Sequence, residues 1–192
     1  MASTSTPRSQ ATRDRILEAA RTIFATHGYE SATLRNIARQ ADTNVALLIR
    51  YFGSKEDLFA IAADFDLRLP PLSELDRNMV GETMVTHFLA VWEESCSGRE
   101  LVALLRAASS HAAAKVRMQQ IFHEQVLAAI VSLGISPQEA ATRASFVASQ
   151  MLGFALIRYV LEFEEASLDH ETVVHVLGRT IQQYLTQPLS AP

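Results

Sequence analysis

The sequence predicts an all-helical protein. Of its 192 residues 48% are apolar, whereas glycine and proline number only seven and six. Most of these glycines and prolines stand between long stretches rich in Ala, Leu, Val, Arg and Glu, which favours helices over a β architecture with many turns. The length and the apolar content suffice for one or two domains with a substantial core.

The composition also limits the kinds of site and the compartment. Cys96 is the single cysteine, so an intramolecular disulfide and a multi-cysteine metal site are impossible, and a reducing cytoplasm fits. Residues 1–10 hold no apolar core of an export signal, and no apolar run approaches the length of a membrane span. We therefore expect a cytoplasmic protein without membrane contact, cofactor or metal.

The charge is divided unevenly along the chain. The net charge is -4, which by itself argues weakly against a nucleic-acid partner. Residues 1–60, however, carry eight Lys or Arg against six Asp or Glu, whereas residues 61–192 carry nine against fifteen. A DNA partner would therefore meet the front third of the chain.

Four helices are predicted in that front third. A disordered tail over residues 1–10 precedes an amphipathic helix from about Thr12 to His27, with apolar residues recurring on one face and Gly28 at its end. Three further helices are predicted over 33–40, 44–51 and 55–69.

The short second and third of these helices are separated by a tight turn. Asp42 stands where a chain leaving a helix often needs a left-handed residue, a conformation that Asp tolerates. Thr43 or Asn44 can cap the helix that follows. That helix is too short to be stable alone, so its neighbours must hold it through Leu48 and Phe52.

Two short helices joined by a turn of three or four residues are typical of a helix-turn-helix, here between Thr33 and Phe52. The major groove of DNA admits one helix, while the preceding helix contacts the backbone. Thr33 and Lys55 each begin a helix, where a phosphate can dock against the positive helix end. Ser54 with Asp57 is a start pattern for the fourth helix.

Pro70 and Pro71 mark a boundary, and the remainder is predicted to be helical. Helices are expected over 76–95, 99–110, 111–133, 137–164 and 169–186. The predicted domains are thus a helix-turn-helix domain (11–54), a connecting helix (55–69) and a helical domain (70–188).

The front third resembles the tetracycline-repressor (TetR) family of bacterial regulators. About 45 residues carry the resemblance in order and without gaps: Arg15-Ile16-Leu17 with Ala19-Ala20, Phe24, Gly28-Tyr29, Thr33, Ile37-Ala38, Leu48 to Phe52, Ser54-Lys55-Glu56 and Leu58-Phe59. The resemblance implies a three-helix DNA-binding module linked to a C-terminal ligand-binding and dimerisation domain.

The resemblance also implies roles for individual residues. Positions matching Thr33, Tyr51 and Lys55 commonly contact phosphates, and those matching Thr43 to Ala46 and Arg50 lie on or beside the recognition helix. The predicted DNA-binding residues are therefore Thr33, Arg35, Thr43, Asn44, Val45, Ala46, Arg50, Tyr51 and Lys55. Three positions depart from the family pattern. Asp42 stands where a glycine is usual in the turn, Ile49 stands where a DNA-contacting tyrosine is frequent, and Tyr51 stands where a histidine is frequent.

Several of these residues have two interpretations. Asn44 can pair with adenine, or it can only cap the helix; Arg50 can read guanine, or it can contact a phosphate. Arg35 and Arg39 can contact phosphates at the edge of the interface, or they can simply belong to a solvated helix face. Thr43 fits a buried methyl group better than a DNA contact.

Such regulators dimerise through their last two long helices, and the helix predicted over 137–164 is apolar almost all round, so it must bury more than one face. Gly153 and Gly178 favour a close helix approach across a dimer. The predicted interface of a two-fold dimer comprises Val147, Phe154, Ile157, Leu161, Val173, Leu177 and Ile181.

The resemblance further implies a cavity for a small-molecule effector. Large apolar side chains supply its candidate walls, although such residues are more often simply core. The candidates are Met84, His87, Phe88, Trp92, Leu105, Met118, Phe122, Gln150, Met151 and Arg158. His87, Gln150 and Arg158 would orient the ligand.

We therefore expect a transcriptional repressor that binds a pseudo-palindromic operator as a dimer and is released by an inducer. The first alternative is a helical interaction protein without sequence-specific DNA binding, supported only by Ile49 and the acidic net charge. The second is an enzyme, but the six histidines form no helical metal pair and no phosphate loop or nucleophile elbow is present.

Overall fold

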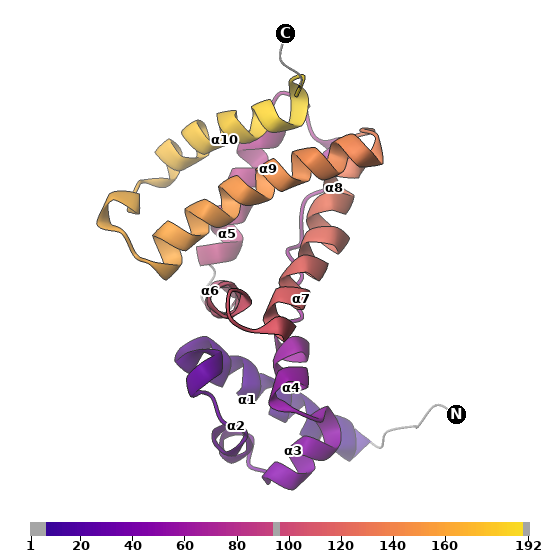
Figure 1. Ribbon diagram of the computed structural model, residues 1–192, viewed down its shortest axis with the longest axis vertical. Helices are drawn as coiled ribbons and strands as arrows, with labels where there is room; N and C mark the ends of the chain where they lie inside the picture. The colour runs from indigo at the N-terminus through magenta and orange to yellow at the C-terminus, as the bar shows by residue number, and fades with distance from the viewer. Residues whose placement is uncertain (1–6, 94–96, 190–192) are drawn as a thin grey trace. The chain divides into compact units, whose positions relative to one another are not determined.

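The computed structural model describes residues 7–93 and 97–189, and over these residues it consists of helices and loops without a strand (Figure 1). The all-helical prediction is confirmed. Cys96 and residues 1–6 lie outside the described residues.

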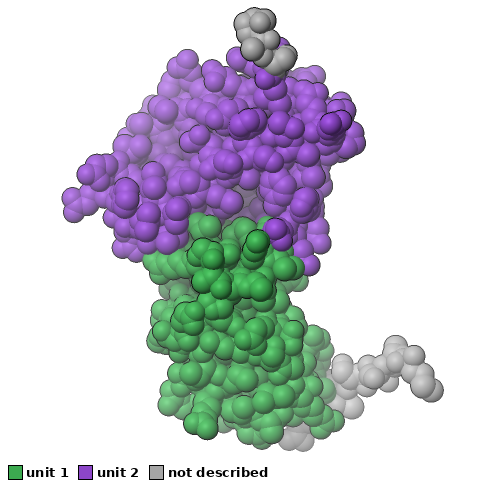
Figure 2. All heavy atoms as spheres, viewed as in Figure 1, with its two compact units in different colours: residues 1–65, 99–118 green, residues 66–98, 119–192 purple. Residues whose placement is uncertain are grey.

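The chain forms two compact units (Figure 2). Unit 1 comprises Met1–Phe65 and Arg99–Met118, and unit 2 comprises Asp66–Gly98 and Gln119–Pro192. The predicted domain boundaries differ from this division and stay predictions.

Unit 1 is built on a long first helix. The helices of its front part are α1 (Pro7–Ser31), α2 (Leu34–Gln40), α3 (Val45–Phe52) and α4 (Lys55–Ala62), and α6 (Ser97–Ala108) and most of α7 (Ala112–Ile121) complete the unit. Ile16, Phe24, Ile37, Leu48 and Phe59 are all buried. One apolar side chain or more from each of α1 to α4 thus enters a common core.

The bounds of two predicted helices in unit 1 were wrong. α1 begins at Pro7, so residues 7–10 are helical rather than part of a disordered tail, in keeping with the fitness of proline for a first helical turn. Although α1 is counted as far as Ser31, Gly28 has the non-helical angles φ 72° and ψ 170°, so the regular first helix ends at Gly28 as predicted.

The fourth helix ends at Ala62 rather than at Leu69. Guanidinium groups stabilise this early end, because Arg21 Nε donates to the carbonyl oxygen of Ala62 at 3.4 Å and Arg117 Nε to that of Ala63 at 3.0 Å. Arg117 also forms an ion pair with Asp64. Cations are favourable at the negative end of a helix.

Unit 2 contains α5 (Val80–Glu93), α8 (Ala128–Val131), α9 (Pro137–Ala155) and α10 (His170–Thr186). A π-helical segment, Phe122–Leu127, leads into α8, and another, Leu156–Val160, extends α9. The helix predicted over 137–164 thus ends at Val160, and the one predicted from residue 76 begins at Val80.

Helices α5 and α10 pack closely where two glycines meet. A Cβ atom at Gly81 would lie 2.2 Å from the carbonyl oxygen of Gly178, and one at Gly178 would lie 2.9 Å from Cγ of Glu82. The Gly81 N–H donates to Oε1 of Gln182 at 2.8 Å. Gly178 therefore serves a helix crossing within the chain, and its predicted place in a dimer contact was wrong.

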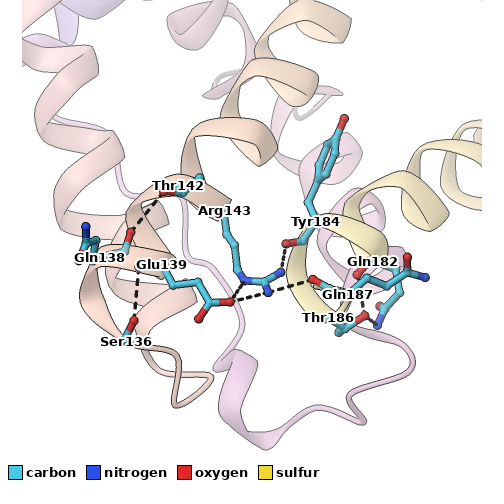
Figure 3. Close-up of polar contacts among 9 residues, drawn as sticks. All are labelled: Ser136, Gln138, Glu139, Thr142, Arg143, Gln182, Tyr184, Thr186 and Gln187. Atoms are coloured by element: carbon cyan, nitrogen blue, oxygen red, sulfur yellow. Dashed lines mark hydrogen bonds and ion pairs between the residues drawn. The ribbon is translucent and has the colours of Figure 1, made fainter. Parts of the chain in front are cut away.

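A buried arginine joins α9 to the end of α10 (Figure 3). The Arg143 guanidinium donates to Oε1 of Glu139 at 2.6 Å, to the carbonyl oxygen of Tyr184 at 2.5 Å and to that of Gln187 at 2.9 Å. Because only 5% of Arg143 is exposed, its charge needs these partners. They satisfy carbonyl groups that the end of α10 leaves open.

The continuous helical stretch Pro137–Val160 is long and apolar enough to cross a membrane by length and composition, which differs from the expectation for this sequence. One third of its most apolar window is buried in the protein. Core helices of globular domains meet the same criterion, and Ala140, Ala144 and Val147 on α9 are buried within unit 2.

The glycine crossing yields a stability prediction. Gly81→Ala should lower the free energy of unfolding by about 1–3 kcal/mol, because the added methyl group meets backbone atoms that cannot move aside. Thr86→Ala, on the exposed face of the same helix, is the control and should change it by only a few tenths of a kcal/mol. Equal urea midpoints for the two variants would contradict the close crossing.

Candidate nucleic-acid interface

The turn between α2 and α3 is closed by backbone hydrogen bonds. The Asp42 N–H donates to the carbonyl oxygen of Arg39 at 3.2 Å, and the Thr43 N–H to that of Ala38 at 2.9 Å. This pattern needs a left-handed residue at its centre, and Asp42 has φ 48°. The left-handed conformation predicted for Asp42 is confirmed.

Helix α3 is held at both ends. At its start, Oδ1 of Asn44 accepts a hydrogen bond from the Leu47 N–H at 2.8 Å, and at its end Gly53 has φ 81°. Two side chains anchor its inner face, Leu48 with 0% exposure and Phe52 with 4%. These contacts stabilise a helix that has only eight residues.

The outer face of α3 is open to solvent. Asn44, Ala46, Ile49 and Arg50 are exposed, and Ile49 has 47% of its surface accessible. A short helix with one buried and one exposed face, placed next to α2 (Figure 1), is the arrangement that a major groove accepts.

The helices before and after α3 both begin with capped N-termini. Oγ1 of Thr33 accepts from the Asn36 N–H at 3.1 Å at the start of α2. At the start of α4, Ser54 Oγ accepts from the Asp57 N–H at 3.0 Å, and Asp57 Oδ2 accepts from the Ser54 N–H at 3.2 Å. The predicted start of the fourth helix at Ser54 is confirmed.

Lys55 lies over an aromatic ring. Its Nζ atom is 4.3 Å from the centroid of Tyr29 and donates to the carbonyl oxygen of Glu30 at 3.4 Å. The Tyr29 hydroxyl donates to Oε1 of Glu56 at 2.9 Å, and burial, this hydrogen bond and nearby carboxylates raise the pKa of Tyr29 to about 12. Tyr29 therefore stays neutral and fixes the position of the Lys55 ammonium.

Tyr51 is bonded within the module. Its hydroxyl donates to Oγ of Ser9 at 3.2 Å, and the Arg13 guanidinium lies 5.5 Å from the Phe52 ring centroid. Sequence reasoning missed the contact of Ser9 because it placed residues 1–10 in a tail. Pro7, in the position favoured at the first turn of a helix, was the available indication.

The predicted DNA-binding residues all lie on α2, α3, the turn between these helices or the start of a helix. Thr33, Arg35, Asn44, Ala46 and Arg50 are exposed, whereas Thr43, Val45, Tyr51 and Lys55 are half-buried. The structure thus leaves a surface of polar and basic side chains around α3.

Known proteins match both parts of this chain. A family model described as bacterial regulatory proteins, tetR family, matches residues 16–62, and a model for the C-terminal domain of tetracycline repressor-like proteins matches residues 78–185. The chain belongs to the TetR family.

Relatives of this TetR-family chain agree in fold. A TetR-family regulator of Streptomyces coelicolor A3 is 30% identical, with 95% of this chain and 98% of that chain covered and a TM-score of 0.60. A transcriptional regulator of Rhodococcus sp. Rha1 is 24% identical, with 93% and 98% covered and a TM-score of 0.65.

Among curated proteins, the HTH-type transcriptional repressor AcnR of Corynebacterium glutamicum is 43% identical over 54 residues. That match covers 28% of this chain and 29% of the length of AcnR. The similarity to AcnR is therefore limited to less than a third of either protein.

The structure separates the candidate effector residues of this TetR-family chain. Leu105 and Met118 belong to unit 1 and the others to unit 2. Met84, Phe88, Trp92 and Met151 are buried, and Gln150 is exposed. The Nε2 atom of His87 lies 2.7 Å from the carbonyl oxygen of Leu67. Phe122 is half-buried in the π-helical segment.

Two of these candidates line one cavity. Trp92 and Arg158 lie on a cavity of about 570 Å³, whereas Gln150 lines a different depression of about 270 Å³ together with Phe154.

Four predicted interface residues of this TetR-family chain are not available to a partner. Val147, Val173, Leu177 and Ile181 have between 0 and 7% of their surface exposed. They are buried because α9 and α10 pack against each other and α10 packs against α5. The interface predicted at these four residues was wrong, whereas Ile157 and Leu161 are exposed and Phe154 is half-buried.

The turn yields a prediction about Asp42. Asp42→Val should lower the free energy of unfolding by about 1–2 kcal/mol, because a β-branched residue is strained at positive φ, whereas Asp42→Gly should preserve stability. Thr43→Val, one residue on and outside the left-handed region, is the matched control. A loss for Thr43→Val as large as for Asp42→Val, in urea unfolding, would refute the strain argument.

Proposed function

We propose that this chain is a transcriptional repressor that binds a pseudo-palindromic operator as a dimer and is released by a small-molecule effector. The observation that carries the proposal is the exposed outer face of α3, held by the Asn44 cap and by the buried Leu48 and Phe52. Membership of the TetR family and the repressor name of AcnR support it. A cytoplasmic location follows from this function.

Asn44 is proposed to read a base as well as to cap α3. The amide oxygen that accepts from the Leu47 N–H has a second lone pair, and the amide nitrogen of an asparagine offers two further donors. Pairing with adenine uses one acceptor and one donor of an amide. Arg50, exposed on the same face, is the second proposed base contact.

Phosphate contacts are proposed at the rim of α3. Thr33, Arg35, Tyr51 and Lys55 supply hydroxyl groups and positive charges, and Thr33 and Lys55 do so at helix starts. Contacts of this kind position the protein on the duplex and carry no sequence information.

One observation favours a second candidate function. Ile49 exposes 47% of its surface on the face that would enter the groove, which also suits docking to a protein. The alternative is a helical interaction protein without sequence-specific DNA binding. An enzyme has less support, because the described residues hold no group of three metal-binding side chains and the curated relatives are repressors.

A dimer is proposed to form through the apolar surface of α9 and the adjacent part of α10. Phe146 and Ile157 expose 47% and 37% of their surface, and both line the depression of about 270 Å³ with Gly153 and Tyr184. A Cβ atom at Gly153 would meet nothing within 4 Å, so this side of α9 is open to a second helix. Two copies related by a two-fold axis would present two α3 helices to DNA.

Release by an effector is proposed to occur by population shift. In one state of the dimer the two α3 helices match successive grooves, and in the other they do not. A ligand that binds the second state more tightly lowers operator affinity, by no more than the ratio of its affinities for the two states. The dimer stays intact in this scheme.

Variants at Lys55 and Asn44 should weaken DNA binding in different ways. Lys55→Glu should weaken binding to every sequence and reduce the salt slope by about one, because a phosphate contact is lost. Asn44→Ser keeps a capping oxygen but removes the amide, and should cost roughly tenfold or more in affinity at one base position only. Gel shifts on an operator and its single-base variants measure both.

Lys115→Glu is the matched control, because Lys115 is exposed in unit 1 and is the other lysine of the chain. It should leave operator affinity close to that of the unchanged protein. An equal loss on all sequences for Asn44→Ser would remove Asn44 as a base contact. No binding by the unchanged protein would favour the interaction-protein alternative.

A charge in the apolar surface should break the dimer. Ile157→Glu should give a monomer in light scattering at micromolar concentration, because a carboxylate would be buried without a partner. Val116→Glu, which changes a 51% exposed apolar residue of α7, should leave the dimer intact. A monomer for the unchanged protein, or a dimer for Ile157→Glu, would contradict the proposed interface.

A further inference from the structure

A histidine in the turn between α6 and α7 contacts the end of α1. His111 belongs to unit 1, as does the whole of α1. Its imidazole ring packs against the ring of Tyr29, with centroids 4.2 Å apart and an angle of 58° between the planes. Its Nε2 atom lies 2.8 Å from Oε1 of Glu30. His111 therefore contacts two consecutive residues of the segment that follows Gly28.

The same two residues hold the ammonium of Lys55. The Nζ atom of Lys55 lies 4.3 Å from the ring centroid of Tyr29 and donates to the carbonyl oxygen of Glu30 at 3.4 Å. An ammonium has three N–H donors, so this bond leaves two of them for a phosphate. His111 and Lys55 are thus linked through Tyr29 and Glu30.

The end of α1 needs support from side chains. Gly28 has φ 72° and ψ 170°, so residues 29–31 do not continue the regular helix. The ring of Tyr29 is held by Phe59, whose centroid lies 4.9 Å away. The carboxylate of Glu30 is 79% exposed and is bound by His111. The position of this segment therefore depends on contacts with α4 and with the turn between α6 and α7.

His111 itself is fixed at both ring nitrogens. An ionised carboxylate only accepts hydrogen bonds, so Nε2 carries the hydrogen of the bond to Glu30. Nδ1 lies 2.9 Å from the hydroxyl of Ser110, and the His111 N–H donates to the carbonyl oxygen of Ala107 at 2.9 Å. The side chain of His111 is only 20% exposed. Its ring is thus a fixed support for the residues that it contacts.

We propose that His111 is a positioning residue for the phosphate contact of Lys55, and that it acts through Tyr29 and Glu30. An ammonium that is already held in place loses less conformational entropy when a phosphate binds, which increases affinity. A residue in the turn between α6 and α7 would thereby set operator affinity without touching DNA. The inference rests on the proposed function, because it requires that Lys55 contacts a phosphate.

The position of the Lys55 ammonium can be measured without DNA, because the chain has only two lysines, Lys55 and Lys115. With 13C-labelled lysine each gives its own NMR signals, and Lys55→Ala assigns them. The ring current of Tyr29 should shift the side-chain protons of Lys55 upfield. His111→Ala should move these signals toward the position of an exposed lysine. Unmoved Lys55 signals would overturn the inference.

The matched control is His27→Ala, which makes the same substitution at an exposed histidine of α1. It should leave the Lys55 signals where they are in the unchanged chain. A shift for His27→Ala as large as for His111→Ala would also overturn the inference, because any disturbance of unit 1 would then move Lys55.

A double-mutant cycle tests the role of His111 in DNA binding. The probe is a duplex that the unchanged chain enriches from a random pool, and the variants are His111→Ala, Lys55→Ala and the two combined. His111→Ala should lower affinity about fivefold in the unchanged chain and less than about twofold in the Lys55→Ala background, because residues that act through one another are not additive. A merely destabilised fold would lower affinity by the same factor in both backgrounds, and that result would overturn the role in DNA binding.

The two measurements separate this inference from the proposed function. If the unchanged chain enriches and binds no duplex, the proposed function fails, while the NMR signals of Lys55 still decide whether His111 positions its ammonium. If the chain binds DNA but His111→Ala costs the same factor in both backgrounds, DNA binding stands and His111 does not act through Lys55.

Discussion

The DNA-binding part of this chain depends on contacts that stabilise helix α3, which would not be stable alone. Helix α3 has eight residues, fewer than a helix needs to be stable alone in water. Its stability comes from the Asn44 cap, from the left-handed turn at Asp42 and from Leu48 and Phe52 in the core of unit 1. Because every anchor lies on one side or at an end, the opposite face of α3 stays open for a ligand as large as DNA.

In unit 2, too, the helices pack through one face and leave another exposed. Helix α10 uses one face against α5, where Gly81 and Gly178 let the backbones approach, and Arg143 of α9 bonds the carbonyl groups at its end. What remains outside is an apolar surface with Phe146 and Ile157, and a cavity whose carboxylates stand beside stacked aromatic rings. The dimer contact that we propose would thus use a surface that the internal packing leaves free.

Local patterns could be predicted well from the sequence, and contacts between distant segments could not. Helical period, the Ser54–Asp57 start and the turn at Asp42 depend on neighbouring residues, so they identified the helix-turn-helix correctly. The burial of Val173, Leu177 and Ile181 depends on packing of α10 against α5 and α9, which are distant from α10 or separated from it by a loop, and that of Val147 depends on packing of α9 against α10. An apolar helix face does not show whether its own chain or a partner covers it. Likewise the contacts that stabilise the early end of α4 come from Arg21 and Arg117, and the hydrogen bond from Tyr51 to Ser9 joins α3 to the start of α1.

The central claim is that two copies of α3 read DNA in a two-fold arrangement. Selection of bound sequences from random duplex DNA by the full chain tests it without knowledge of the operator. The account predicts enrichment of an inverted repeat whose half-sites lie about one helical turn, or a multiple of it, apart. Enrichment of a single unrepeated sequence, or no enrichment above the starting pool, would contradict it.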